Sequence, residues 1–209
     1  MTAPPAAMVF VVDDDPSVRK SLARLIKAAR YEAEVFASVG EFLARPPHEG
    51  PCCLVLDVRM PGPTGLDLQE ALRAVGEGLS IVFISGFLDV LASVKAMKGG
   101  AVDFLVKPVE GTVLLAAIRQ AVARTQADRK QIARVKEVQS RIKTLTPREA
   151  RVFALVVTGM LNKQIGSELG IVEKTVKVYR ARVMEKMRAS SFAELVRLAG
   201  EANVIAAGS

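Results

Sequence analysis

The sequence predicts an α/β domain built on a five-stranded doubly wound parallel sheet, then a long connector helix, then an all-α domain of four helices. Three observations lead to this prediction. Short apolar segments alternate with segments of helical periodicity up to about residue 125. No proline or glycine interrupts residues 112–142. Charge also divides between the halves, since residues 1–125 hold 13 Lys and Arg against 14 Asp and Glu, and residues 126–209 hold 16 against 8.

The apolar segments of the first half have the length of strands, and the segments between them have the periodicity of helices. The expected strands are residues 8–12, 33–36, 52–56, 79–84 and 102–106. The expected helices are residues 17–29, 40–44, 66–75, 90–97 and 112 onward. Strands this apolar, separated by helices, are typical of a parallel sheet covered on both faces. Such sheets bind ligands at the carboxyl ends of their strands.

The segment from residue 112 to about residue 142 is expected to form one long helix or two nearly continuous ones. Its later, polar part carries a sparse apolar stripe of Ile132, Val135, Val138 and Ile142. The stripe fits either a weak coiled-coil seam or a solvated connector, because it lacks four clean heptads. We therefore expect a domain over residues 1–125, a helical linker over 126–143 and a second domain over 144–209.

The last part of the chain has the pattern of a compact helical domain. Thr146 to Glu149 forms a predicted capping box with Pro147 at the first helical position, and Ser191 to Glu194 forms a second one. Between them, a short helix over 162–169 and a longer one over 173–187 are separated by Gly170. This is the helix-turn-helix pattern, in which the second helix enters the DNA major groove.

Composition excludes several classes of protein. No apolar run approaches the roughly 18–20 residues of a membrane-spanning helix, and the first residues lack the basic segment of a secretory signal. Cys52 and Cys53 are adjacent, so we expect reduced, packed thiols in a cytoplasmic protein. With His48 as the one histidine, zinc sites and histidine-dependent triads are nearly excluded. No Gly-rich loop followed by Lys-Ser/Thr is present, so ATP binding is not expected.

Side chains that can bind a metal ion or take part in a reaction follow four of the expected strands. The first strand ends in Asp13-Asp14-Asp15 and the third in Asp57, whereas Ser85 and Lys107 follow the fourth and fifth. Carboxylates gathered at one edge repel one another by ~4 kcal/mol per close pair at an effective dielectric near 20. A hard cation such as Mg²⁺ relieves that repulsion, and a carboxylate can itself accept a phosphoryl group. Taken singly, each of these residues also fits a helix cap, a turn or a surface position.

Four motifs together resemble the receiver domain of two-component response regulators. They are VVDDD at residues 11–15, LDVRMP at 56–61, ISG at 84–86 and KP at 107–108. The run AMKGGAVDFL at 96–105 is similar to the FixJ branch of the FixJ/NarL family in particular. The resemblance implies a flavodoxin-like fold. The sequence departs from the FixJ pattern at Phe87-Leu88-Asp89 and at Val109.

The resemblance also implies a role for each matching residue. Asp57 would be the phosphoacceptor. Mg²⁺ or Mn²⁺ would be held by Asp14, Asp57 and the main-chain carbonyl of Arg59, with Asp13 supporting the site, often through water. Three further residues would bind the phosphoryl group or respond to it: Ser85, Phe104 and Lys107. The family usually has a cis bond at the position of Lys107–Pro108.

Five motifs in the basic half resemble the LuxR-type DNA-binding domain. They are LTPRE at 145–149, NKQI at 162–165, LGI at 169–171, TVKV at 175–178 and VMEKM at 183–187. The departures are Gly166 for a common alanine and Tyr179 for a common histidine. Basic residues crowd the second helix: Lys174, Lys177, Arg180, Arg182, Lys186 and Arg188. The expected DNA contacts are Asn162, Lys163, Lys174, Thr175, Lys177, Val178, Ala181 and Arg182.

These observations predict a phosphorylation-dependent transcription factor and not primarily an enzyme. The expected partners are a sensor histidine kinase, double-stranded promoter DNA, RNA polymerase and a second copy of the chain; no membrane is expected. One alternative is a constitutive DNA-binding regulator whose receiver is only a protein-interaction module. A second is a phosphate sink or phosphotransfer intermediate. A third makes the basic bundle a binder of another protein.

Overall fold

The computed structural model describes residues 7–87 and 89–203. The chain forms two compact units, Met1–Arg129 and Lys130–Ser209, which we describe separately. Within the described ranges, no helix is long and apolar enough to cross a membrane.

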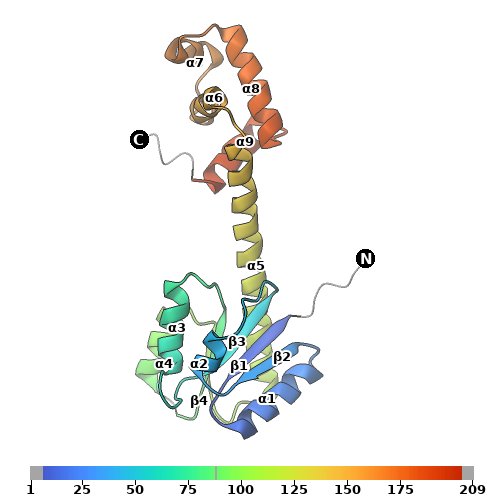
Figure 1. Ribbon diagram of the computed structural model, residues 1–209, viewed down its shortest axis with the longest axis vertical. Coiled ribbons are helices and arrows are strands. Elements are labelled where there is room, and N and C mark those ends of the chain that lie inside the picture. The colour runs from blue at the N-terminus through green and yellow to red at the C-terminus, as the bar shows by residue number, and fades with distance from the viewer. Residues whose placement is uncertain (1–6, 88, 204–209) are drawn as a thin grey trace. The chain divides into compact units, whose positions relative to one another are not determined.

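The first unit is built on a five-stranded sheet in which every neighbouring pair is parallel (Figure 1). Its strands are β1 (Met8–Val12), β2 (Glu32–Phe36), β3 (Cys52–Asp57), β4 (Ile81–Ser85) and β5 (Asp103–Val106). The strand order is β2-β1-β3-β4-β5, so the chain adds β2 on one side of β1 and then β3, β4 and β5 on the other. This change of side between β1 and β3 is typical of flavodoxin-like folds. The predicted fold class is confirmed; β1 has the predicted bounds, and the ends of the other strands lie within two residues of the predicted ones.

Helices cover both faces of this sheet. They are α1 (Pro16–Ala28), α2 (Val39–Leu43), α3 (Gly65–Ala74), α4 (Val90–Lys98) and α5 (Gly111–Lys143). Val9 and Val11 of β1 pack with α1 and α5, whereas Phe10 and Val12 pack with α2, α3 and α4. This alternation follows from the two-residue period of a strand.

The adjacent cysteines obey the same alternation. Cys52 belongs to the core beneath α2–α4 and Cys53 to the core beneath α1 and α5. Both are fully buried free thiols. The prediction that they are packing residues without a mutual disulfide is therefore confirmed.

Helix α5 is one continuous helix of 33 residues that belongs to both units. Leu114 and Ile118 lie in the core of the first unit, and Val138 is fully buried in the core of the second. Ile142 packs against that second core, whereas Ile132 remains 51% exposed. The last members of the predicted apolar stripe thus contribute to the folding of the second unit.

The second unit contains the four predicted helices around one core. They are α6 (Pro147–Val157), α7 (Asn162–Leu169), α8 (Glu173–Met187) and α9 (Phe192–Glu201). The capping box of α6 is complete, since the Thr146 and Glu149 side chains each accept the other's backbone N–H. Gly170 ends α7 with φ of 65°, a conformation that glycine adopts without strain.

The second predicted capping box is wrong in one of its two halves. The Ser191 hydroxyl accepts the Glu194 N–H at 3.1 Å, as predicted. The Glu194 carboxylate, however, accepts from the backbone N–H and hydroxyl of Ser190, at 2.9 and 2.7 Å. The N–H and hydroxyl of Ser190 thus occupy the carboxylate oxygen that the predicted box would have placed on the Ser191 N–H.

Candidate functional site

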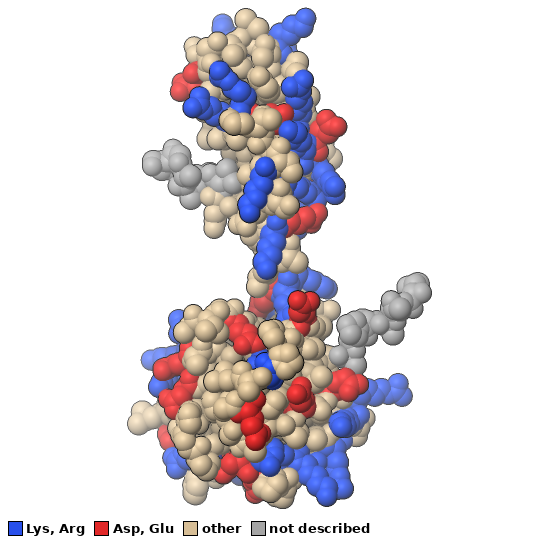
Figure 2. Space-filling model, in the orientation of Figure 1, with Lys and Arg blue, Asp and Glu red and all other residues tan. Residues whose placement is uncertain are grey.

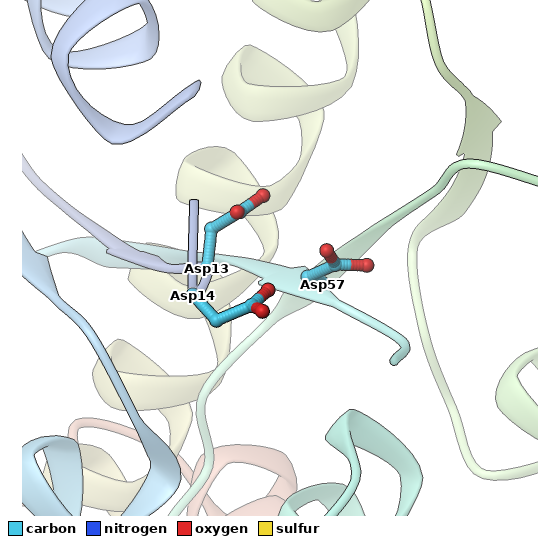
Figure 3. Close-up of side chains that lie close together, drawn as sticks. All are labelled: Asp13, Asp14 and Asp57. Carbon is cyan, nitrogen blue, oxygen red and sulfur yellow. The ribbon is translucent and has the colours of Figure 1, made fainter. Parts of the chain in front are cut away.

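The strand register brings the acidic residues together at the carboxyl edge of the sheet. Val12 pairs with Leu56, so the residues that follow, Asp13 and Asp57, lie side by side. Asp13, Asp14 and Asp57 each offer a carboxylate oxygen within 4.8 Å of the others (Figure 3). Asp13 is fully buried and Asp57 nearly so, whereas Asp14 is exposed.

Lys107 bridges the two buried carboxylates. Its Nζ donates to Asp13 Oδ2 at 2.7 Å and to Asp57 Oδ2 at 2.8 Å. Burial raises the pKa of the Asp13 carboxyl above its ordinary value, although the Lys107 hydrogen bond opposes this. Burial alone would lower the pKa of Lys107, but the hydrogen bonds to both carboxylates raise it, so the lysine stays charged. The Lys107–Pro108 peptide is cis.

The run of three aspartates divides between two tasks. Asp15 caps α1, where its side chain accepts the N–H groups of Ser17 and Val18 at 2.7 and 3.4 Å. The Asp15 N–H in turn donates to Asp13 Oδ1 at 2.9 Å. The helix-cap alternative therefore holds for Asp15, whereas Asp13 and Asp14 join the acidic cluster.

Asp57 is contacted from two directions, and sequence reasoning predicted neither contact. The Arg59 N–H donates to Asp57 Oδ1 at 3.3 Å. A Cβ added to Gly65, the first residue of α3, would lie 2.2 Å from the Asp57 carbonyl oxygen. The available signal was a glycine in the first helical turn, a costly choice unless a neighbouring backbone approaches closely.

Ser85 lies on β4, the neighbour of β3, and Phe104 lies on β5, the neighbour of β4. Asp57 pairs with Ile84, so Ser85 follows by one residue at the same edge. Ser85 is 1% exposed, and its hydroxyl accepts the Phe87 N–H at 3.4 Å. Phe104 is half-buried, with its ring centroid 6.2 Å from that of Phe83.

Two residues that depart from the FixJ-like pattern contact the loop beyond Asp57. Arg59 Nη2 donates to Asp89 Oδ2 at 3.2 Å, and its guanidinium lies 5.6 Å from the Phe87 ring centroid. Asp89 also caps α4 through the Ala92 N–H at 3.0 Å. These contacts join the β3–α3 loop to the start of α4, and no local sequence pattern indicated them.

The acidic cluster has the chemistry of a magnesium site. Its donors are the carboxylate oxygens of three aspartates, which are hard ligands of the kind that Mg²⁺ prefers. Two buried carboxylates share one lysine, so the cluster retains negative charge for a cation to neutralise. The residues present fit this ion.

The second unit presents a basic surface on α7 and α8, and Figure 2 shows Lys and Arg side chains over this unit. Two of the predicted DNA contacts, Asn162 and Thr175, are half-buried. The remaining six are exposed: Lys163, Lys174, Lys177, Val178, Ala181 and Arg182. A groove of about 340 Å³ is lined by Lys174, Thr175, Val178, Tyr179 and Arg182.

Three of the basic residues that crowd α8 are engaged within the fold, and one of them is Lys177, whose Nζ lies 3.2 Å from Glu173 Oε1 one turn away. Lys186 Nζ donates to Glu149 Oε2 at 2.6 Å and to the Thr144 carbonyl at 3.1 Å. Arg180 donates to Asn162 Oδ1 at 3.2 Å and lies 5.3 Å from the Phe192 ring centroid. The basic composition of α8 thus overstates the charge that is free for a partner.

Two family models match the chain, and together they cover most of it. Residues 9–119 match the response regulator receiver domain, and residues 143–199 match the luxR family of bacterial regulatory proteins. Nodulation protein W of Bradyrhizobium diazoefficiens is 46% identical over 92% of this chain and 85% of its own. The transcriptional regulatory protein FixJ of Azorhizobium caulinodans is 41% identical over 94% of this chain and 93% of its own.

Solved structures give the same result. The response regulator StyR matches with a TM-score of 0.84 and 43% identity, over 94% of this chain and 99% of that one. Full-length FixJ from B. japonicum matches with a TM-score of 0.58 and 38% identity, over 97% and 99%.

Fold and acidic edge together define a receiver domain, and the helix-turn-helix unit defines a transcription regulator. The chain belongs to the two-component response regulators, and among them to the FixJ-like members that carry a LuxR-type domain. It therefore regulates transcription, with a histidine kinase and DNA as the partners that its two domains imply.

Proposed function

We propose that Asp57 accepts a phosphoryl group from the histidine kinase and that this modification controls DNA binding. The observation that carries the proposal is the convergence of Asp13, Asp14, Asp57 and Lys107 at one edge of the sheet. An Asp57 carboxylate oxygen attacks the phosphorus of the kinase phosphohistidine. The P–N bond breaks, the histidine leaves, and an acyl phosphate forms.

The neighbouring residues have distinct proposed roles in this transfer. Asp13, Asp14, Asp57 and the Arg59 carbonyl would hold Mg²⁺ or Mn²⁺. The bound cation would supply charge neutralisation for the carboxylates and the phosphoryl oxygens. Lys107 already lies 2.8 Å from Asp57 Oδ2 and would bind a phosphoryl oxygen as a point cation. Slow hydrolysis of the acyl phosphate would return the protein to its starting state.

Phosphorylation adds close to two negative charges beside Ser85 and Lys107. We expect Ser85 to hydrogen bond the phosphoryl group and the half-buried Phe104 to change rotamer in response. These shifts bias a two-state element, and its output is the surface of α4 and β5. We define the α4 face as four exposed apolar residues: Val90, Leu91, Val94 and Met97. A second copy of the chain would cover this face and form a homodimer.

The second unit would then bind promoter DNA through α8. Lys177 would donate to guanine edges and Val178 would contact a thymine methyl group, with Lys174, Thr175, Ala181 and Arg182 beside them. Asn162 and Lys163 of α7 would contact phosphates. We retain residues 1–125 as the receiver, 126–143 as the helical linker and 144–209 as the DNA-binding domain. The expected setting is the cytoplasm, with RNA polymerase as a further partner.

Sedimentation and DNA binding with and without acetyl phosphate test the proposal. A duplex is first selected from a randomised pool with the full-length, phosphodonor-treated protein. Acetyl phosphate and Mg²⁺ should then promote dimerisation and tighten binding to that duplex, and Asp57→Asn should abolish both effects. Tight binding to the duplex that is the same with and without acetyl phosphate would favour a constitutive regulator. Phosphorylation without salt-dependent DNA binding would favour a phosphate sink or a protein-binding bundle.

A further inference from the structure

We propose that Arg19 is a positioning residue for the metal site: it fixes the Asp13 carbonyl and thereby aims the Asp14 carboxylate. Arg19 lies in the first turns of α1, and its Nη1 donates to the Asp13 carbonyl oxygen at 2.5 Å. The inference rests on the proposed use of the acidic cluster as a cation site. It adds a residue that lies outside that cluster.

Every polar group of Asp13 already has a partner, and Arg19 supplies the last of them. The Asp13 N–H donates to the Phe36 carbonyl at 3.2 Å. Its two carboxylate oxygens accept from the Asp15 N–H and from Lys107 Nζ. Arg19 satisfies the remaining carbonyl, so the orientation of the peptide between Asp13 and Asp14 is fixed.

Asp14 depends on this peptide because it has little else to hold it. It is exposed, and its side chain accepts no hydrogen bond within the part of the chain that the structure describes. Figure 3 shows its carboxylate beside those of Asp13 and Asp57. The backbone on either side of Asp14 therefore sets the direction of its Cα–Cβ bond, which carries this carboxylate toward the cluster.

That backbone is tied to α1 at two points. On the C-terminal side of Asp14, the Asp15 carboxylate caps α1, and the main-chain carbonyl of Asp15 accepts the Arg19 N–H at 3.0 Å. On the N-terminal side, the Arg19 side chain holds the Asp13 carbonyl. Arg19 thus contacts both neighbours of Asp14, one through its backbone and one through its guanidinium.

Arg19 does not act here as a partner for the carboxylates. Among the described residues it forms no ion pair, and its contact is with a neutral carbonyl. Its positive charge near the cluster would, if anything, oppose the binding of a cation. If Arg19 acts through positioning, its removal weakens Mg²⁺ binding. If it acts only through its charge, its removal strengthens Mg²⁺ binding.

The test measures the Mg²⁺ affinity of the full-length protein by calorimetry, with Mn²⁺ as a second probe. Arg19→Ala should weaken Mg²⁺ binding about tenfold, the lower end of the effect of losing a residue that orients metal ligands. Arg19→Lys keeps the charge but loses the guanidinium geometry, and it should also weaken binding. Lys20→Ala is the matched control, because this exposed neighbour carries the same charge on the same helix.

Each outcome decides the inference. Unchanged or tighter Mg²⁺ binding by Arg19→Ala would overturn it and leave a bystander charge. A lowered Tm of the metal-free variant with an unaltered Mg²⁺ dissociation constant would also overturn it, since the role would then be structural only. If the unaltered protein bound neither Mg²⁺ nor Mn²⁺, the proposed metal site would fail first. That result is distinguishable because it needs no variant.

Discussion

At the scale of single residues, the site combines Lys107 and two buried carboxylates at one edge of the sheet with a close backbone contact between Gly65 and Asp57. A parallel sheet brings its strand ends to one edge, so residue type and strand order were enough to gather Asp13, Asp57 and Lys107. The close approach of Gly65 to Asp57 depends on how a loop returns to the sheet. Likewise, the ion pair of Arg59 with Asp89 joins residues far apart in sequence, and no local sequence pattern predicts it.

Gly65→Ala tests the importance of this close approach. A Cβ 2.2 Å from the Asp57 carbonyl oxygen forces the backbone to move, and we expect a loss of about 1–3 kcal/mol in stability. Uptake of phosphate from acetyl phosphate should fall with it. Gly78→Ala is the control, because a Cβ there meets nothing within 4 Å. Equal stability of the two variants would show that the loop adapts freely.

At the scale of elements, helix ends were predictable where the cap is local and wrong where a neighbouring residue competes. The Thr146 box has no competitor and is complete, whereas Ser190 captures Glu194 from Ser191. The N-cap of helix α8 is Val172, an exposed residue with extended backbone and no side-chain hydrogen bond to the first turn. The first turn of the helix thus lacks the side-chain acceptor that a hydroxyl at this position could supply.

Val172→Ser should therefore stabilise the second unit. Its φ of −72° and ψ of 148° suit an N-cap, so the serine hydroxyl can accept an N–H of the first turn. We expect a gain of about 1 kcal/mol, measured by chemical denaturation. The opposite change at a complete cap, Thr146→Ala, should cost a similar amount. A Val172→Ser protein no more stable than the parent would contradict this account of α8.

The Glu149–Lys186 pair should make the second unit sensitive to acid. The Lys186 hydrogen bond, followed by the Thr146 N–H, lowers the pKa of Glu149 from 4.5 to about 2. Because the folded-state pKa is depressed, the stabilisation is present above about pH 4.5 and is lost as pH falls toward 2. Thermal unfolding across this range should show that loss. Glu149→Gln should be less stable at neutral pH and should flatten the dependence; an unchanged acid slope would contradict it.

At the scale of the whole molecule, the two units differ in charge and share helix α5. The basic excess lies after residue 125, which correctly marked the half with the helix-turn-helix. The long helix was predicted from the lack of breakers, but the burial of Val138 in the second core was not. A stripe this sparse does not reveal which partner it will pack against.

DNA binding should separate the two kinds of basic residue on the second unit. Lys163→Ala should weaken binding to all duplexes alike and reduce the salt slope by about 1, as expected for a phosphate contact. Lys177→Ala should cost about 1–3 kcal/mol on the selected duplex and relax its specificity. Anisotropy titrations at several salt concentrations measure both. The same uniform loss for both variants would argue against base readout by Lys177.

The most direct test of the account is the intact mass of the full-length protein after treatment with acetyl phosphate and Mg²⁺. We predict that the unaltered protein gains one phosphoryl group. Asp57→Asn should gain none, and neither protein should gain one when Mg²⁺ is withheld. A phosphoryl group on Asp57→Asn, or none on an unaltered protein shown to bind Mg²⁺, would contradict the assignment of Asp57 as the phosphoacceptor.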